Sequence, residues 1–160
     1  MNIELIAIHN PGAYNLILGQ AHFIKTVEDL HEALVQASSV IEFGLSFCEA
    51  SGPCLIRSSG NNKELINLAE KNAQLLSAGH TFIIFLNKAF PIQVLNAIKT
   101  IPEVCRIFCA TANPLEVVIA HSDQGKGILG VVDGFSPKGI ENEDDKKQRT
   151  SFLRDIGYKL

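Results

Sequence analysis

The sequence predicts a single domain of the α+β class, spanning residues 1–160, in which helices pack on a sheet of mixed parallel and antiparallel strands. Residues 40–48 alternate between apolar and polar side chains, as a strand with two different faces does. Residues 80–86 are almost entirely apolar, as a central strand covered on both faces would be. Helical segments between strands favour parallel pairing, and short turns elsewhere favour antiparallel hairpins at the edges.

The remaining elements follow from periodicity and from turn residues. Thr26, with Asp29 three residues later, resembles a capping box and predicts the start of the first helix. Asn61 is expected to cap the second helix, Gly79 to end it, and Pro91 to lie in the first turn of the third. The expected strands are 3–8, 14–18, 40–48, 54–58, 80–86, 104–110, 115–121 and 128–132, and the first, third and last helices are 26–38, 91–100 and 146–156. The polar segment 136–148 is expected to form a mobile surface loop.

Composition narrows the classes of function. Of the 160 residues, 46% are hydrophobic and 19% are charged, which is typical of a globular chain. The net charge of −3 argues against nonspecific binding of nucleic acid, which needs a basic surface. The N-terminus lacks the basic region of a signal peptide, and no apolar run approaches the roughly 20 residues of a membrane span. We therefore expect a cytoplasmic protein with no membrane partner.

The four cysteines do not predict a disulfide framework. Cys105 and Cys109 lie four residues apart in an expected strand, a separation of roughly 13 Å that is too long for a disulfide. The five histidines show no close pairing with Glu or Asp, so a transition-metal site is not expected.

Polar residues follow three expected strands. Glu49 and Ser51 come after the first of these, Asn87 after the central strand, and Thr111 with Asn113 after the next. Because ligands of open α/β sheets bind beyond the carboxyl ends of parallel strands, these residues are expected to form the rim of one pocket. The alternative is ordinary turn chemistry, since Asn-Pro and Ser-Gly-Pro are common turn sequences.

Glu49 continues the apolar register of its strand, so its carboxylate needs a partner. It could hold a ribose hydroxyl or orient His22. Alternatively, it pairs with Lys25 or Arg57 and contacts no ligand.

Residues 125–132 match the pattern G-x-G-x-x-G-x-V. The other motifs of protein kinases and a Walker A motif are absent, so this is not a protein kinase. The backbone N–H groups around Gly127 and Gly130 could approach a phosphate, or the glycines could instead occupy crowded packing points of a tight hairpin. Asp133, which follows this strand, could bind a metal or a hydroxyl group, or could cap a turn.

His22 and Lys25 lie directly before the first expected helix. The unpaired N–H groups of a helix N-terminus favour anions, so a phosphate on or near the His22 ring would be stabilised there. The alternative is a histidine in a strand-to-helix turn that hydrogen-bonds to the backbone. The other histidines are expected to be structural or solvated.

Several longer motifs carry a resemblance to a known family. They are the segments 19–30, 47–53, 84–91, 104–105, 109–114, 127–134 and 152–158. Together they cover nearly the whole chain and resemble the adenosine-specific kinases. The resemblance implies binding of adenosine or AMP, a histidine that carries phosphate, and a homotrimer. Two positions depart from the family pattern: Ala21 replaces a common serine, and Cys54 replaces a common basic residue, which weakens any expected phosphate contact at position 54.

The expected function is therefore phosphotransfer on adenosine or AMP, with His22 as nucleophile and Glu49 and Asp133 as further catalytic candidates. The candidate binding residues are Lys25, Ser51, Asn87, Thr111, Asn113, Gly127 and Gly130. Magnesium is a candidate cofactor, although the sequence contains no ligand motif for it. Two alternatives stay open: a non-catalytic sensor or carrier of adenosine or AMP, and a small oligomeric enzyme of unrelated chemistry that uses Glu49 or Asp133 as a base.

Overall fold

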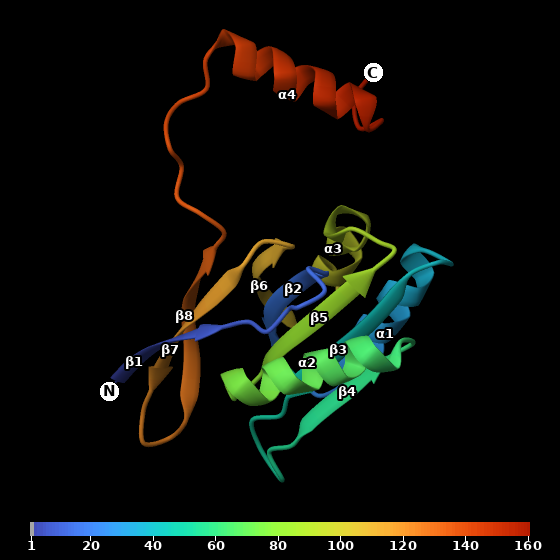
Figure 1. Cartoon of the computed structure of the whole chain (residues 1–160). Coiled ribbons are helices and arrows are strands. Elements are labelled where there is room, and N and C mark those ends of the chain that lie inside the picture. The colour runs from blue at the N-terminus through green and yellow to red at the C-terminus, as the bar shows by residue number, and fades with distance from the viewer. Residues whose placement is uncertain (1) are drawn as a thin grey trace.

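The computed structural model describes residues 2–160, which form two sheets and four helices (Figure 1). The strands are β1 (Asn2–Ala7), β2 (Asn15–Ala21), β3 (Glu42–Cys48), β4 (Ile56–Gly60), β5 (Thr81–Asn87), β6 (Val104–Thr111), β7 (Leu115–His121) and β8 (Lys126–Asp133). The helices are α1 (Thr26–Ala37), α2 (Lys63–Leu76), α3 (Pro91–Lys99) and α4 (Glu143–Asp155). One sheet has the strand order β4-β3-β5-β2-β6, and the other has the order β1-β7-β8.

The α+β class is confirmed, but the prediction of a mixed sheet is wrong, because all paired strands in both sheets are antiparallel. The helices α1 and α3 do connect strands that run in the same direction, β2 with β3 and β5 with β6. However, β5 lies between β2 and β3, and β2 lies between β5 and β6. Each helical crossover therefore leaves room for one strand of opposite direction, and local sequence patterns carry no information about that insertion.

The five-stranded sheet is the middle layer of the molecule. On one face, α1 and α3 cover the side chains of Phe43, Leu45 and Phe47 from β3, together with residues of β2 and β5. On the other face lie α2 and the inner side of the three-stranded sheet. The central strand β5 is buried from Thr81 to Leu86, as its continuous apolar sequence predicts.

The ends of α2 differ from the prediction by a few residues. Asn62, rather than Asn61, is the N-cap, and its side chain accepts a hydrogen bond from the Leu65 backbone N–H at 3.2 Å. The side chain of Asn61 is instead bound to the backbone of β3 and its preceding residue, through Phe43 N and Ile41 O, each at 2.8 Å. The helix ends at Leu76 and not near Gly79, and its C-cap is Ser77, which adopts a left-handed conformation with φ of 48°.

The predicted capping box of α1 is also wrong. Lys25 occupies the N-cap position without a side-chain cap, and the Thr26 hydroxyl donates to the Phe23 carbonyl. Asp29 pairs with Lys25 rather than with the backbone at the helix start.

At the other end of the chain, α4 begins at Glu143, inside the segment predicted to be a loop, because Asn142 caps it and forms a reciprocal capping box with Asp145.

All four cysteines are free thiols. Burial raises the pKa of Cys48 to about 11 and that of Cys109 to about 12, so both are neutral packing groups at physiological pH. Within residues 2–160, none of the helices is long and apolar enough to cross a bilayer.

Candidate functional site

Strand direction places His22 and Glu49 at the same edge of the five-stranded sheet. β2 and β3 both run antiparallel to β5, with Gln20 opposite Thr81 and Phe47 opposite Phe82. The residues that directly follow β2 and β3 therefore emerge at the edge where β5 begins. We call this end of the sheet the histidine edge.

The other predicted rim residues lie at the opposite edge. Asn87 is paired with Glu42 at the beginning of β3, and Thr111 is paired with Leu16 near the beginning of β2. The prediction of one shared rim is therefore wrong within a single chain, because its rule applies to parallel strands and these strands are antiparallel.

Local hydrogen bonds account for this second group. Asn87 donates to the Glu42 carboxylate at 2.9 Å, and the Asn113 backbone N–H donates to the Thr111 hydroxyl at 3.0 Å. The Asn113 side chain donates to Asp133 at 3.3 Å. These contacts match the turn chemistry that was the alternative interpretation of these residues.

The His22 side chain is exposed in the turn between β2 and α1. Its backbone N–H donates to the Glu103 carbonyl at 2.9 Å, which attaches the turn to the segment before β6. The imidazole ring lies near Phe23, with 6.1 Å between ring centroids, and its nitrogens hydrogen-bond to no described residue. The ring is therefore available to a ligand.

Three backbone N–H groups directly after His22 are also free of acceptors among residues 2–160: those of Phe23, Ile24 and Lys25. Their carbonyls are used, since the N–H groups of Thr26, Val27 and Glu28 donate to them at 3.0–3.2 Å. The hydrogen bonding of the first turn of α1 thus begins before Thr26. The unpaired N–H groups belong to the residues that directly follow His22, and not to Thr26. Such donors favour an anion.

A cluster of three charged side chains, Lys25, Asp29 and Glu103, lies at this turn. Lys25 forms an ion pair with Asp29, and its Nζ lies 3.7 Å from Oε1 of Glu103. The Glu103 side chain is 4% exposed, and its Oε1 has no hydrogen-bond partner among the described atoms. Burial, and then hydrogen bonding with Asp29, raise the pKa of Glu103, while hydrogen bonds from Lys25 and Glu103 lower the pKa of Asp29. Of the two carboxyls, Glu103 therefore binds a proton more readily than Asp29.

This cluster predicts a pH dependence of stability. The pKa of Glu103 is higher in the folded than in the unfolded state, so the folded protein binds more protons and loses stability as pH rises from the ordinary glutamate pKa through the raised value. Glu103→Gln keeps a hydrogen-bond donor for Asp29 and removes this loss. We expect the variant to gain stability relative to the original protein as pH rises above the ordinary glutamate pKa, measured by urea unfolding at a series of pH values.

The exposed neighbour of Asp29 supplies the control, because Glu28→Gln removes a carboxylate outside the cluster. If the unfolding free energies of Glu103→Gln and of the original protein change with pH in the same way, the raised pKa of Glu103 is contradicted.

A cleft of about 680 Å³ also opens at the histidine edge. It lies between the β3–β4 loop, the C-terminal end of α2 and the β7–β8 hairpin, and Glu49, Cys54, Gln74, Lys126 and Gly127 are among its lining residues. Its size is typical of small-molecule sites, which run to roughly 300–1,000 Å³. Ser51 lies in the exposed turn next to this cleft, where its carbonyl accepts from Cys54 N at 3.3 Å.

Glu49 has the partner that its buried register required. Arg57 donates to its two carboxylate oxygens at 3.3 and 3.4 Å, and the Leu55 backbone N–H donates to Oε2 at 3.0 Å. Of the alternatives considered from sequence, the Arg57 pair is the one observed. The carboxylate keeps lone pairs that a ligand hydroxyl could occupy.

The glycines of the β7–β8 hairpin are not at crowded packing points. A Cβ atom built on Gly127 or Gly130 would meet no atom within 4 Å, so the packing interpretation is wrong for both. Gly127 pairs with Ala120 and lines the cleft, whereas Gly130 pairs with Val118 in the middle of the strand.

His80, one of the histidines expected to be structural or solvated, connects the cleft to the His22 turn. Its backbone N–H donates to the Cys48 carbonyl at 2.7 Å, and its carbonyl accepts from Ala21 N at 3.0 Å. It adopts a left-handed φ of 62° and its ring stacks on Phe47 at 5.9 Å between centroids. Such a conformation is uncommon for a residue other than glycine, and the sequence contains no signal for it. Sequence reasoning missed Glu103, because its contact with Lys25 joins segments far apart in the chain.

No group of three or more His, Cys, Asp or Glu side chains within residues 2–160 is placed to hold a metal ion.

The fold and this edge define a small α+β protein with an exposed histidine, a helix start that favours anions, and a separate cleft at the same edge, whose lining does not include His22. The chain belongs to the adenosine-specific kinase family, whose sequence model matches residues 6–159. The crystal structure of the PH1918 protein from Pyrococcus horikoshii OT3 is similar to it, with 44% sequence identity and a TM-score of 0.95, over 99% of this chain and 98% of that chain. The comparison with curated proteins found no match.

Proposed function

We propose that the protein is a phosphotransferase for adenosine or AMP, in which His22 carries the phosphoryl group. Membership of the adenosine-specific kinase family supports a function related to adenosine. The observation that carries the mechanism is the exposed imidazole of His22, next to the three acceptor-free N–H groups of residues 23–25. A nucleophile and donors for a phosphate are thereby contiguous in the chain.

In this mechanism a nitrogen of the neutral His22 ring attacks the terminal phosphorus of a phosphate donor. A P–N bond forms, the P–O bond to the donor breaks, and the electron pair of that bond stays on the donor's oxygen. In the second half, a hydroxyl or phosphate oxygen of the adenosine compound attacks the phosphorus, and the P–N bond breaks. The electron pair of that bond returns to the ring nitrogen, a proton from an attacking hydroxyl passes to solvent, and His22 is regenerated. The N–H groups of residues 23–25 and the Lys25 ammonium would balance the charge of the phosphoryl group in both halves.

The cleft is the proposed site of the nucleoside. Glu49 would accept hydrogen bonds from ribose hydroxyls, and Arg57 holds that carboxylate in place. Lys126 lines the same cleft and would pair with a phosphate, and Gly127 would allow close approach of the backbone there.

The proposed role of magnesium is to shield the phosphates of the donor. Magnesium in such sites is usually bound by one or two carboxylates together with substrate phosphates. Glu49 is the carboxylate of the cleft, and it is already paired with Arg57, so the donor's phosphates would supply most ligands.

A sensor or carrier of adenosine or AMP is the second candidate, favoured by the absence of a recognisable nucleoside-triphosphate motif in the sequence. Cytoplasmic location and assembly as a homotrimer remain predictions from sequence and family resemblance.

Intact-mass analysis distinguishes these functions. The purified protein is measured before and after incubation with ATP, magnesium and adenosine, and peptides are mapped at neutral or basic pH because the P–N bond of phosphohistidine hydrolyses in acid. We expect a gain of one phosphate on the peptide that contains His22. An unchanged mass, with adenosine binding shown by calorimetry, would instead support the sensor or carrier.

A further inference from the structure

The C-terminal arm, residues 134–160, makes almost no contact with the rest of its own chain. After β8 it leaves as an extended segment and ends in α4, which stands clear of the sheets (Figure 1). Its one backbone hydrogen bond to the body joins Gly134 N to the Pro114 carbonyl at 2.9 Å. No residue of α4 is buried.

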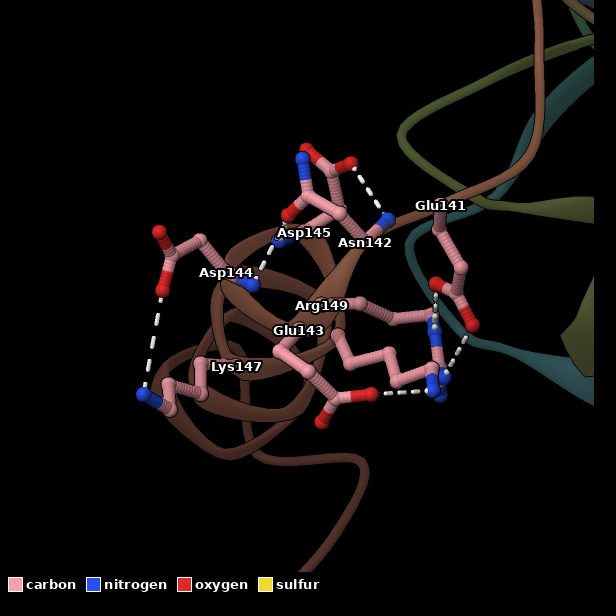
Figure 2. A network of polar contacts seen from close by, with 8 residues as sticks. Glu141, Asn142, Glu143, Asp144, Asp145, Lys147 and Arg149 are labelled. Carbon is pink, nitrogen blue, oxygen red and sulfur yellow. Dashed lines mark hydrogen bonds and ion pairs between the residues drawn. The ribbon is translucent and has the colours of Figure 1, made fainter.

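Only local interactions hold α4 together, and they gather at its beginning (Figure 2). Asn142 and Asp145 form the capping box, and Arg149 donates to both oxygens of Glu141 at 2.9 and 3.1 Å. These groups are exposed, and exposed pairs of this kind contribute little to stability. A helix of 13 residues supported only by such pairs is marginal in water, so α4 needs a surface to dock on.

The arm also presents large apolar side chains to solvent. Phe135 is 86% exposed, Ile140 98%, Phe152 58% and Tyr158 50%, and Ile156 and Leu160 are exposed as well. At roughly 150–250 Å² for a whole aromatic side chain, the three rings alone offer on the order of 400 Å². With the aliphatic residues added, the arm approaches the ~800 Å² per partner of a stable interface.

A complementary surface lies on the outer face of the three-stranded sheet. Ile3 and Leu5 of β1 are 62% and 57% exposed, and Leu129 and Val132 of β8 are 60% and 46% exposed. Leu5 is in register with Val118 of the central strand β7, and Val132 is opposite Glu116, so the apolar side chains of β1 and β8 flank a central strand that carries one carboxylate on this face. The opposite face of this sheet packs into the core, and α2 lies on that inner side.

We propose that the arm of one copy docks on this outer sheet face of a second copy of the same chain. The arm starts at the end of β8, which is an edge strand of this sheet, and leads away from its own body, so it leaves its own sheet face uncovered. Exchange between identical copies covers every arm and every sheet face in equal numbers. Such exchange is met by reciprocal contacts in a two-fold dimer or by head-to-tail contacts around a closed ring. The proposal is independent of the chemistry at His22.

The full chain is compared by analytical ultracentrifugation with two variants, one at each surface. Phe152→Ser with Ile156→Ser changes the arm, and Leu5→Glu changes the sheet face. We expect an oligomer for the original protein and an increase in the dissociation constant of at least about 30-fold for each variant. Lys147→Ala, on an exposed part of α4, is the matched control and should leave the assembly unchanged.

Urea unfolding of the dissociated variants checks that the body is still folded, and hydrogen exchange follows α4, whose amides should lose protection when the arm is released. If the original protein is a monomer, the proposal is overturned, and the arm would instead dock on an apolar site of a different protein. An oligomer that persists in both variants would overturn it too, since the interface would then lie elsewhere.

Discussion

Replacing His22 by alanine should abolish phosphoryl transfer while the protein still binds adenosine. His22 is the only group proposed to form a bond to phosphorus, so its loss removes the reaction path, and we expect a fall in rate of at least about 1,000-fold. The ring is exposed and its nitrogens hydrogen-bond to no described residue, so its removal should not disturb the fold. Adenosine affinity, measured by calorimetry, should change by less than about threefold, since the proposed nucleoside cleft is lined by other residues.

His9→Ala is the matched control, because His9 is exposed, lies two residues after the end of β1 and plays no part in the proposed site. Transfer should persist in this variant. Full labelling of His22→Ala would remove His22 from the mechanism. Simultaneous loss of transfer and of adenosine binding would show that His22 holds the nucleoside rather than the phosphoryl group.

Gly44→Ala should cause the largest loss of stability of any single methyl addition in the sheet. Gly44 lies in β3 on the face that meets α2, where an added Cβ would lie 2.1–2.3 Å from backbone atoms of Leu65 and Ile66. Backbone atoms of a packed helix cannot move aside as a flexible side chain can, so α2 must shift from the sheet. We expect a loss of about 3 kcal/mol in the free energy of unfolding, near the upper end for overpacked cores, and a fall of roughly 10 °C in Tm.

Gly130→Ala provides the comparison within a strand, since no atom lies within 4 Å of the added Cβ there. Its stability should be unchanged or slightly raised, because alanine loses less backbone entropy than glycine on folding. Equal stabilities of the two variants in urea unfolding would show that α2 approaches β3 less closely than the structure indicates.

The strands and the central layer were largely predictable from sequence. The alternation in residues 40–48 correctly separates the side chains that face α1 and α3 from those that face α2. The apolar run before Asn87 correctly identifies the central strand, because only a strand covered on both faces can be apolar throughout. Helix ends were less predictable: several polar residues compete for each cap, as Asn61 and Asn62 do, and tertiary contacts decide which one binds the helix.

The candidate site could be predicted only in part. The sequence placed His22 and Lys25 before a helix, and the structure adds that the free N–H groups belong to residues 23–25. Glu49 was identified as a carboxylate in need of a partner, and its pairing with Arg57 answers that need. Asn87 and Thr111 were assigned to the same rim on the assumption of parallel strands. The antiparallel pairing separates them from His22 by the length of the sheet.

By itself, then, the sequence determined the α+β class, the strand periodicities, the family and the position of His22 before a helix, because these depend on contiguous residues and on ordered motifs. Only the tertiary structure decided which strands are neighbours, which edge each polar residue occupies, and that Glu103 and His80 support the His22 turn. It also decided that the C-terminal arm stands apart from its own body. The physical reason is that strand order and burial arise from contacts between distant segments, and a local pattern specifies that a side chain is buried without specifying its neighbour.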